Sequence, residues 1–193
     1  MSAHQTNRMR GQSLMEFTMV LPLLIVVALG LVEVSYVLLD QHIVTKLTRE
    51  GSNLISRNTA LDDAASALRA MSAHPVNLDT GSKLIFSVIR NVPTVGAANY
   101  NTPILAQRYE YGDLAGQSAI RTRGGASFGP APEYSAANQD GNVNLQVTSL
   151  PANFVSLGGS VYVTELYTTH PTLTPLAGFG IQVPETLYSI AYF

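Results

Sequence analysis

Sixteen consecutive residues near the N-terminus, Phe17–Val32, include no charged side chain. Acids flank this run at Glu16 and Glu33, and Val34–Leu39 extends the largely apolar stretch to 23 residues counted from Phe17. A helix of that length is about 35 Å long, which is enough to cross a bilayer core of about 30 Å. We therefore expect a membrane-spanning helix over about residues 17–39.

The charges that precede this helix indicate its orientation. Residues 1–10 include Arg8 and Arg10 and no acid. By the positive-inside rule, the N-terminus stays in the cytoplasm and the rest of the chain lies on the other side of the membrane. Three kinds of protein share this layout: a secreted protein with a signal peptide cut near Gly30, a single-pass membrane protein, and a subunit that loses a short leader before the helix.

Glu16 distinguishes between these three kinds of protein. A carboxylate at the start of an apolar helix is unfavourable in lipid by a few kcal/mol, so such a residue is functional by default. Neither a signal peptide nor a simple anchor needs it. Pro22 and Gly30, inside the run, are tolerated in membrane helices because neighbouring groups can satisfy the freed backbone atoms. We expect them to give the helix local flexibility, with a kink or an easily melted turn near Pro22.

The residues around Glu16 form a motif. Gly11, four further residues, Glu16 and the aromatic Phe17 resemble the cleavage and assembly motif of type IV prepilins. The longer string GQSLMEFTMVLPLLIVVALGLVEVSY is similar to TadE-like proteins of the tight-adherence (Tad or Flp) pilus system. Thr48–Gly51 (TREG) also fits that family, and Val161–Pro175 fits it more loosely.

This resemblance implies roles for the motif residues. A prepilin peptidase would cut between Gly11 and Gln12, so that residues 1–11 are a leader peptide. Glu16 would become the fifth residue of the mature chain, and Phe17 belongs to the same assembly motif. A carboxylate in lipid is stabilised by a buried cation, and the implied cation is the N-terminal amine of an adjacent subunit. That pairing would set the axial register during assembly.

The resemblance also implies a cellular role. The chain would be a minor pilin, or pseudopilin, that helps to assemble or cap an adhesive pilus or a related secretion assembly. Its partners would be other pilins, the prepilin peptidase and an inner-membrane platform protein. It would reside in the bacterial inner membrane with a periplasmic head, and would then enter the pilus.

Composition argues against several other functions. Charged residues make up only 12% of the chain, whereas soluble domains average about 25%. The net charge of −2 and the lack of a basic run give no support to nucleic-acid binding. There is no cysteine, the four histidines are scattered, and no serine lies in a G-x-S-x-G motif. We therefore expect no enzyme activity, no metal or cofactor, and no small-molecule substrate.

Two polar segments need separate interpretation. The glycine-rich stretch 124–129 lacks the Lys-Ser/Thr ending of a phosphate-binding loop and is expected to be a flexible loop. Asn138, Asp140, Asn142 and Asn144 alternate as calcium ligands can, but only one of them is a carboxylate. A polar hairpin that turns at Asp140 and Gly141 is favoured, and a calcium site near Asp140 stays open.

We expect an α+β fold in which one long helix packs against a small antiparallel sheet. The helix should run over about residues 12–57 and belong to the membrane in its first half. Residues 58–193 should form an extracytoplasmic head. The stripe that would pack the helix onto the head consists of apolar side chains at helical spacing: Tyr36, Leu39, Ile43, Leu47 and Leu54.

Within the head, Asn58 or Thr59 is expected to cap a second helix over Ala60–Met71, with His74 and Pro75 stopping it. Four strands are expected at Lys83–Arg90, Gln107–Tyr111, Val161–Tyr167 and Leu187–Phe193. The strict alternation over Val143–Val147 predicts one more half-buried strand. Residues 115–138 should form a long loop, and His74 and His170 should be turn residues because each precedes a proline.

Overall fold

The structure is a computed structural model that describes residues 5–175, 178, 180 and 182–193, with side chains described from Ser13 onward except Ala152. It divides into two compact units. The first contains the chain up to Leu39 together with Pro171–Glu185, and the second contains Asp40–His170 and Thr186–Phe193. Each unit is described below by itself.

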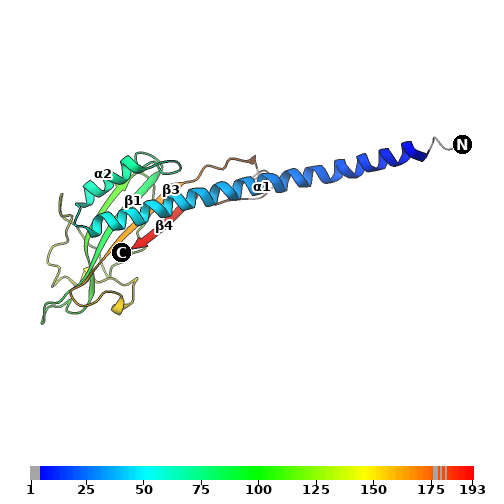
Figure 1. Cartoon of the computed structure of the whole chain (residues 1–193). Coiled ribbons are helices and arrows are strands. Elements are labelled where there is room, and N and C mark those ends of the chain that lie inside the picture. The colour runs from blue at the N-terminus through cyan, green and yellow to red at the C-terminus, as the bar shows by residue number, and fades with distance from the viewer. Residues whose placement is uncertain (1–4, 176–177, 179, 181) are drawn as a thin grey trace. The chain divides into compact units, whose positions relative to one another are not determined.

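Helix α1, Gln5–Ser56, is 52 residues long and contributes to both units. It begins before the predicted start near residue 12, so Gly11 lies within the helix, and it ends one residue before the predicted end. The helix continues through Pro22 and Gly30. The predicted α+β fold is confirmed, because α1 is followed by a second helix and four antiparallel strands (Figure 1).

The strands form one antiparallel sheet in the order β2-β1-β3-β4. Their bounds are Ser82–Asn91 for β1, Pro103–Gly112 for β2, Ser160–Thr169 for β3 and Thr186–Tyr192 for β4. These are the four strands predicted at the corresponding positions. The central strand β1 is buried along almost its whole length, which explains why its sequence is a continuous apolar run and not an alternating one.

One face of the sheet packs against the second half of α1. The Thr48 hydroxyl lies 3.0 Å from the Ser189 hydroxyl of β4, and Ser52 donates a 3.0 Å hydrogen bond to the carbonyl of Ala191. A Cβ atom added to Gly51 would lie only 2.8 Å from Cγ2 of Thr164 on β3. Small residues therefore let the helix backbone approach the strands closely.

The predicted packing stripe is wrong for most of its residues. Of its five members only Leu47 is buried, and Tyr36 and Leu39 are exposed. The buried residues of α1 in the second unit lie on a face that shares only Leu47 with that stripe: Asp40, Val44, Leu47, Thr48, Gly51, Ser52 and Ile55. The prediction counted only large apolar residues, whereas the contact with the sheet depends on small and hydroxyl-bearing ones.

Helix α2, Leu61–Met71, confirms the second predicted helix. Its apolar residues Leu61, Ala64, Ala65 and Leu68 are buried, while Asp62 and Asp63 occupy its first turn, where the helix dipole favours acids. The predicted cap is wrong. The N-cap residue is Ala60, which makes no side-chain cap, and Asn58 instead adopts a φ of 60° in the preceding turn.

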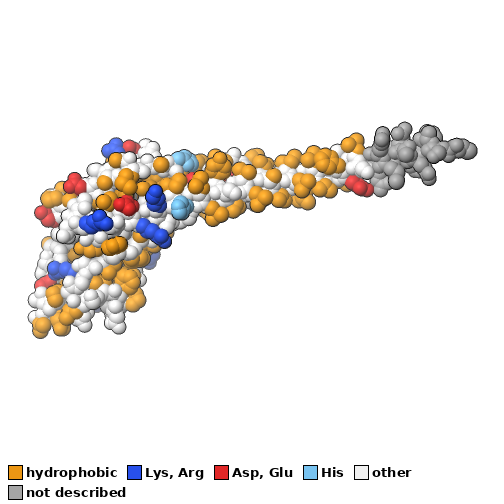
Figure 2. Space-filling view, viewed as in Figure 1, with side chains coloured by type: hydrophobic (Ala, Val, Ile, Leu, Met, Phe, Trp, Pro, Cys, Tyr) orange, Lys and Arg blue, Asp and Glu red, His pale blue; other side chains and the backbone are white. Residues whose placement is uncertain are grey.

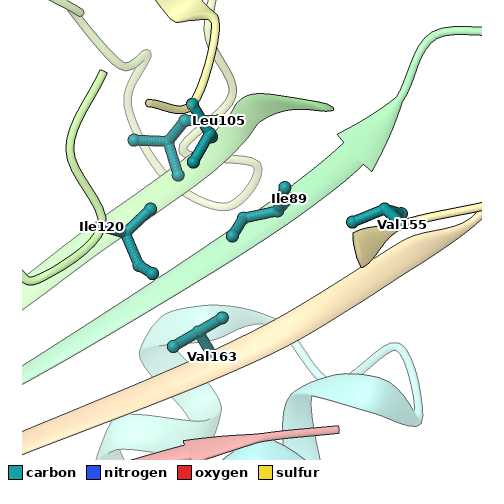
Figure 3. Packing of buried hydrophobic residues seen from close by; sticks show 6 residues of the cluster. Ile89, Leu105, Ile120, Val155 and Val163 are labelled. Carbon is teal, nitrogen blue, oxygen red and sulfur yellow. The ribbon is translucent and has the colours of Figure 1, made fainter. Parts of the chain in front are cut away.

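Segments from the long connection between β2 and β3 cover the opposite face of the sheet. A buried cluster joins strand residues to loop residues there (Figure 3), and its members are Ile89, Leu105, Ile120, Val147, Val155 and Val163. The predicted strand Val143–Val147 is wrong, because residues Val143–Leu145 form a short 3₁₀ helix in this cover. Of the three apolar residues in the alternation, Leu145 and Val147 are buried and Val143 is exposed, so the alternation does not define one buried face.

A turn does form at Asp140 and Gly141, but the predicted hairpin is wrong, because a 3₁₀ helix and not a strand comes directly after the turn. The Asp140 carboxylate instead fastens the loop to the end of β1, where it lies 3.3 Å from Nη2 of Arg90 and accepts a 2.8 Å hydrogen bond from Thr94. The Asn142 side chain accepts from the amide of Asn144 and caps the 3₁₀ helix. These polar residues are therefore used in loop contacts.

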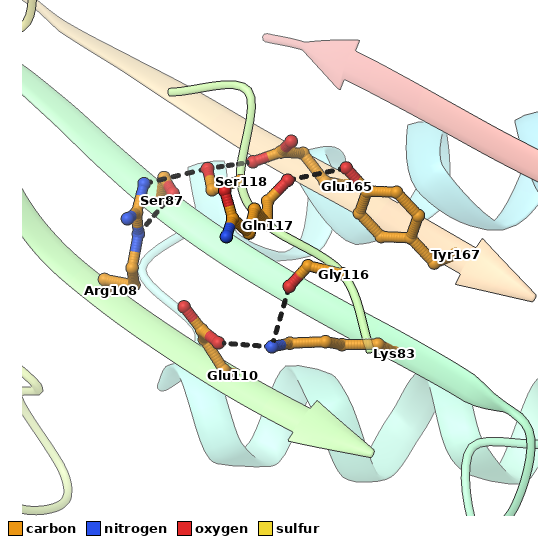
Figure 4. A network of polar contacts seen from close by, with 9 residues as sticks. All are labelled: Lys83, Ser87, Arg108, Glu110, Gly116, Gln117, Ser118, Glu165 and Tyr167. Carbon is orange, nitrogen blue, oxygen red and sulfur yellow. Dashed lines mark hydrogen bonds and ion pairs between the residues drawn. The ribbon is translucent and has the colours of Figure 1, made fainter. Parts of the chain in front are cut away.

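A buried carboxylate organises the polar part of the same covered face (Figure 4). Glu165 on β3 is fully buried and accepts hydrogen bonds from the Ser118 hydroxyl, the Ala119 amide at 2.7 Å and the Tyr188 hydroxyl at 2.9 Å. Burial, followed by the negative charge of Glu165, raises the pKa of Tyr188. These hydrogen bonds join β3, β4 and the loop at residues 118–119. Each oxygen of the Glu165 carboxylate accepts at least one of them, as a buried charged group requires.

The close approach at Gly51 supplies a test of the packing. Replacing Gly51 with Val should destabilise the second unit by about 1–3 kcal/mol, because the added methyl groups collide with the stiff side chain of Thr164. This loss of stability is measured by urea unfolding in mild detergent, with the circular dichroism of the tyrosines as the signal. Gly30→Val is the matched control on the same helix, because no atom lies within 4 Å of its added Cβ. Equal stability of the two variants would contradict the packing described here.

Candidate functional site

The first half of α1 carries an extensive exposed apolar surface (Figure 2). Of the large apolar side chains that are exposed in the described residues, sixteen lie between Leu14 and Leu39. The most apolar 18-residue window of Ser13–Ser56 has a mean hydropathy of 2.5. Among the described residues, α1 is the one helix that is long and apolar enough to cross a membrane. This agrees with the predicted membrane-spanning segment.

The predicted site residues all lie on this helix. Gly11 and Gln12 are in its first turns, and the Glu16 and Phe17 side chains are exposed one turn later. Pro22 is inside the helix, and no atom lies within 4 Å of a Cβ added to Gly30. These residues therefore follow one another along a single helix. No other element in the described part of the chain brings them together into a pocket.

A second acid on α1, Glu33, is held by a loop of the same unit. Its side chain is buried, with 1% exposure, although it follows directly on the uncharged run. The carboxylate accepts hydrogen bonds from the amide of Leu173 at 3.2 Å, and from the amide and hydroxyl of Thr174 at 2.9 and 2.7 Å. Three donors at one carboxylate form a specific clamp, because hydrogen bonds to a charged acceptor are about twice as strong as neutral ones.

A third acid, Asp40, belongs to the second unit. Its Oδ2 lies 2.7 Å from Nδ1 of His170, and these side chains are only 3% and 1% exposed. His74 approaches the other oxygen at 3.7 Å but is 69% exposed. Asp40 thereby connects α1 to the end of β3 and to the segment after α2. His170 was predicted to be a turn residue, and the structure corrects this: it is a buried partner of an acid.

The predictions from the sequence missed Glu33 and Asp40 as structural residues. A signal was present, because the two acids are seven residues apart and so lie on one face of the helix. An acid at the edge of an apolar helix also requires a partner. The partners come from residues about 130 to 140 positions further along the chain, and nothing in the local pattern identifies them.

These features define a class of protein: among the described residues, one helix is long and apolar enough to cross a membrane, and it continues into an α+β unit. The family model of TadE-like proteins matches residues 11–53, which confirms the resemblance over this segment. The match begins at Gly11 and ends within α1, and it includes Glu16, Glu33 and Asp40. No curated protein and no solved structure matches the chain. The family match connects the chain with the Tad pilus system, its components and the membrane, and this family is structural in character.

The Glu33 clamp can be tested by hydrogen exchange. Glu33→Ala should speed exchange of the Leu173 and Thr174 amides at least tenfold, because each hydrogen bond to a charged group contributes about 1.5–3 kcal/mol. The comparison requires the full chain in detergent micelles, with exchange followed by mass spectrometry. Val34→Ala, at an exposed neighbour on the helix, should leave both amides unchanged. Unchanged exchange in Glu33→Ala would show that other contacts hold the loop.

Proposed function

We propose that this chain is a minor pilin of the Tad system, cut by prepilin peptidase between Gly11 and Gln12 and assembled with other pilins through α1. The observation that carries the proposal is the exposed apolar surface between Leu14 and Leu39 with Glu16 near its start. The family match supports it, because the match begins at Gly11. A helix that serves only as a membrane anchor needs the apolar surface, but it does not need the acid Glu16 at the start of that surface.

Cleavage prepares the helix for assembly in this proposal. It leaves a free amine on Gln12, four residues before Glu16 and about 6 Å from it along the helix axis. A carboxylate in lipid is unfavourable alone and is stabilised by a cation from a neighbour. The amine of the adjacent subunit supplies that cation, so the Glu16 position selects one axial register. Phe17 packs in the same contact.

The exposed apolar surface of α1 provides the contact area between neighbouring subunits. In lipid there is no hydrophobic driving force between helices, so association depends on close van der Waals packing and on polar pairs. The sixteen exposed apolar side chains provide the packing, and Glu16 provides the polar pair. Pro22 and Gly30 let the helix adjust locally as it leaves the bilayer and joins its neighbours.

The orientation follows from Arg8 and Arg10, which keep the N-terminus cytoplasmic and place the second unit in the periplasm. In this location the leader faces the prepilin peptidase and an inner-membrane platform protein can engage the helix. The subunit then passes into the pilus. Its second unit, Asp40–His170 with Thr186–Phe193, supplies the surface that the assembly presents.

The cleavage site is tested by intact mass spectrometry of the chain expressed together with prepilin peptidase. The mature chain should start at Gln12, and Gly11→Leu should leave the leader attached. Gly30→Ala is the control, because it alters the position where a signal peptidase would act and should not change the start at Gln12. A start near Leu31, or retention of residues 1–11 by the unaltered chain, would overturn the proposal.

The assembly role of Glu16 has a separate test. The Glu16→Ala chain should still be cut after Gly11. After cross-linking, the amount of other pilins recovered together with it should be at least tenfold lower than with the unaltered chain. The reason is that removing one partner of a buried ion pair is unfavourable by about 3–5 kcal/mol. Thr18→Ala is the control, since among the described residues its hydroxyl donates to the carbonyl of Met15 in the same helix. Normal recovery with Glu16→Ala would refute the register role and leave the cleavage result standing.

A further inference from the structure

A polar pocket lies on the loop-covered face of the sheet, within the second unit. Its volume is about 630 Å³, within the range of about 300–1,000 Å³ that small-ligand sites occupy. Strands β1 and β2 provide Lys83, Arg108 and Glu110, and the rim is formed by residues 116–118 and 120–122 of the loop. Figure 4 shows Arg108, Glu110 and Lys83 beside Gly116 and Ser118.

The charges of the pocket do not balance. Three cations line it, Lys83, Arg108 and Arg121, against one acid, Glu110. Lys83 is already paired with Glu110 at 2.8 Å and donates to the carbonyl of Gly116 at 3.0 Å. In the described part of the chain, neither Arg108 nor the exposed Arg121 forms an ion pair with a carboxylate. Two positive charges are therefore available to a ligand.

Arg108 is held in place by neutral acceptors. Its Nη2 donates to the Ser118 hydroxyl at 2.8 Å and to the carbonyl of Ile120 at 2.7 Å, and its Nε donates to Ser87 at 3.3 Å. Its Nη1 has no hydrogen-bond partner among the described residues. The guanidinium is thus oriented before a ligand arrives, which reduces the entropy lost on binding.

The surroundings of Arg108 favour an incoming anion. Burial lowers the pKa of Arg108, and the charges of Glu110 and Glu165 oppose this effect. The oxygens of Glu165 accept from Ser118, Ala119 and Tyr188, so the hydrogen bonds connect Glu165 to Arg108 through the Ser118 hydroxyl, while the charge of Glu165 also acts on Arg108 directly. A partly desolvated guanidinium attracts an oxyanion strongly, and the N–H groups of Nη1 can donate charge-assisted hydrogen bonds to it.

We propose that this pocket binds an oxyanion, a carboxylate or a phosphate carried by a polar ligand, through Arg108 and Arg121. Arg108 supplies the oriented donors at the sheet, and Arg121 supplies a second charge at the rim. Gln117 and Thr122 offer hydrogen-bonding groups to the polar remainder of the ligand. This inference is independent of the proposed cleavage and assembly through α1.

The test titrates the full chain in uncharged detergent with sodium glucuronate and, separately, with sodium phosphate by isothermal calorimetry. Saturable binding is expected. Arg121→Gln should weaken it at least threefold, because that exposed side chain has no partner among the described residues that could be lost with it. Arg108→Lys should weaken it about tenfold, because a lysine keeps the charge but lacks the several fixed donors that bind Ser87, Ser118 and Ile120 while Nη1 faces a ligand.

Arg57→Gln is the matched control, since Arg57 is an exposed arginine outside the pocket. Unaltered affinity in this control, with losses in both pocket variants, supports the proposal. Tighter glucuronate than phosphate binding would identify a carboxylate-bearing sugar as the source of the anion, and the reverse would identify a phosphate group. No saturable binding of either anion, or equal losses in Arg57→Gln and Arg121→Gln, would overturn it.

Discussion

The high free energy of a charge in hydrocarbon is the constraint on which the rest of this structure depends. It explains why no charged side chain occurs between Phe17 and Val32 and why the first half of α1 exposes so much apolar surface. It also gives Glu16 its significance, since an acid at the start of that surface is unfavourable unless a cation meets it. In the proposed pilus the cation comes from a neighbouring subunit, so the same constraint that anchors the helix also selects its partner.

The buried acids further along the chain obey the same rule with internal partners. Glu33 accepts from two amides and a hydroxyl, Asp40 lies against His170, and Glu165 accepts from two hydroxyls and an amide. Each acid joins segments that are far apart in the sequence. Burying a charge requires such partners, and the partners in turn determine where the loops lie. Arg108 is the exception that motivates the proposed anion site, because its acceptors are neutral and one of its nitrogens has no partner in the described residues.

Local patterns predicted most of the regular structure. Both helices and the four strands of the sheet were found because each has an apolar or β-forming signal of its own, although this signal is weaker at Gln107–Tyr111. The failures occurred where a local pattern was ambiguous. Val143–Val147 alternates like a strand, but Val143–Leu145 form a 3₁₀ helix and Val147 packs in the cluster on the sheet. The stripe from Tyr36 to Leu54 was misplaced because Gly51 and its small neighbours, which allow close packing, carry little weight in a hydrophobic pattern.

The sequence by itself determined the anchoring helix, the motif at Gly11 to Phe17 and the TadE-like resemblance, because these are properties of consecutive residues. Only the tertiary structure decided which side of α1 is buried, how Glu33 and Asp40 are satisfied, and that Arg108 and Arg121 line one pocket. The physical reason is that a charge or a close contact is satisfied by groups brought together in space. The partners of Glu33 are about 140 residues away in the chain, and no periodicity connects them.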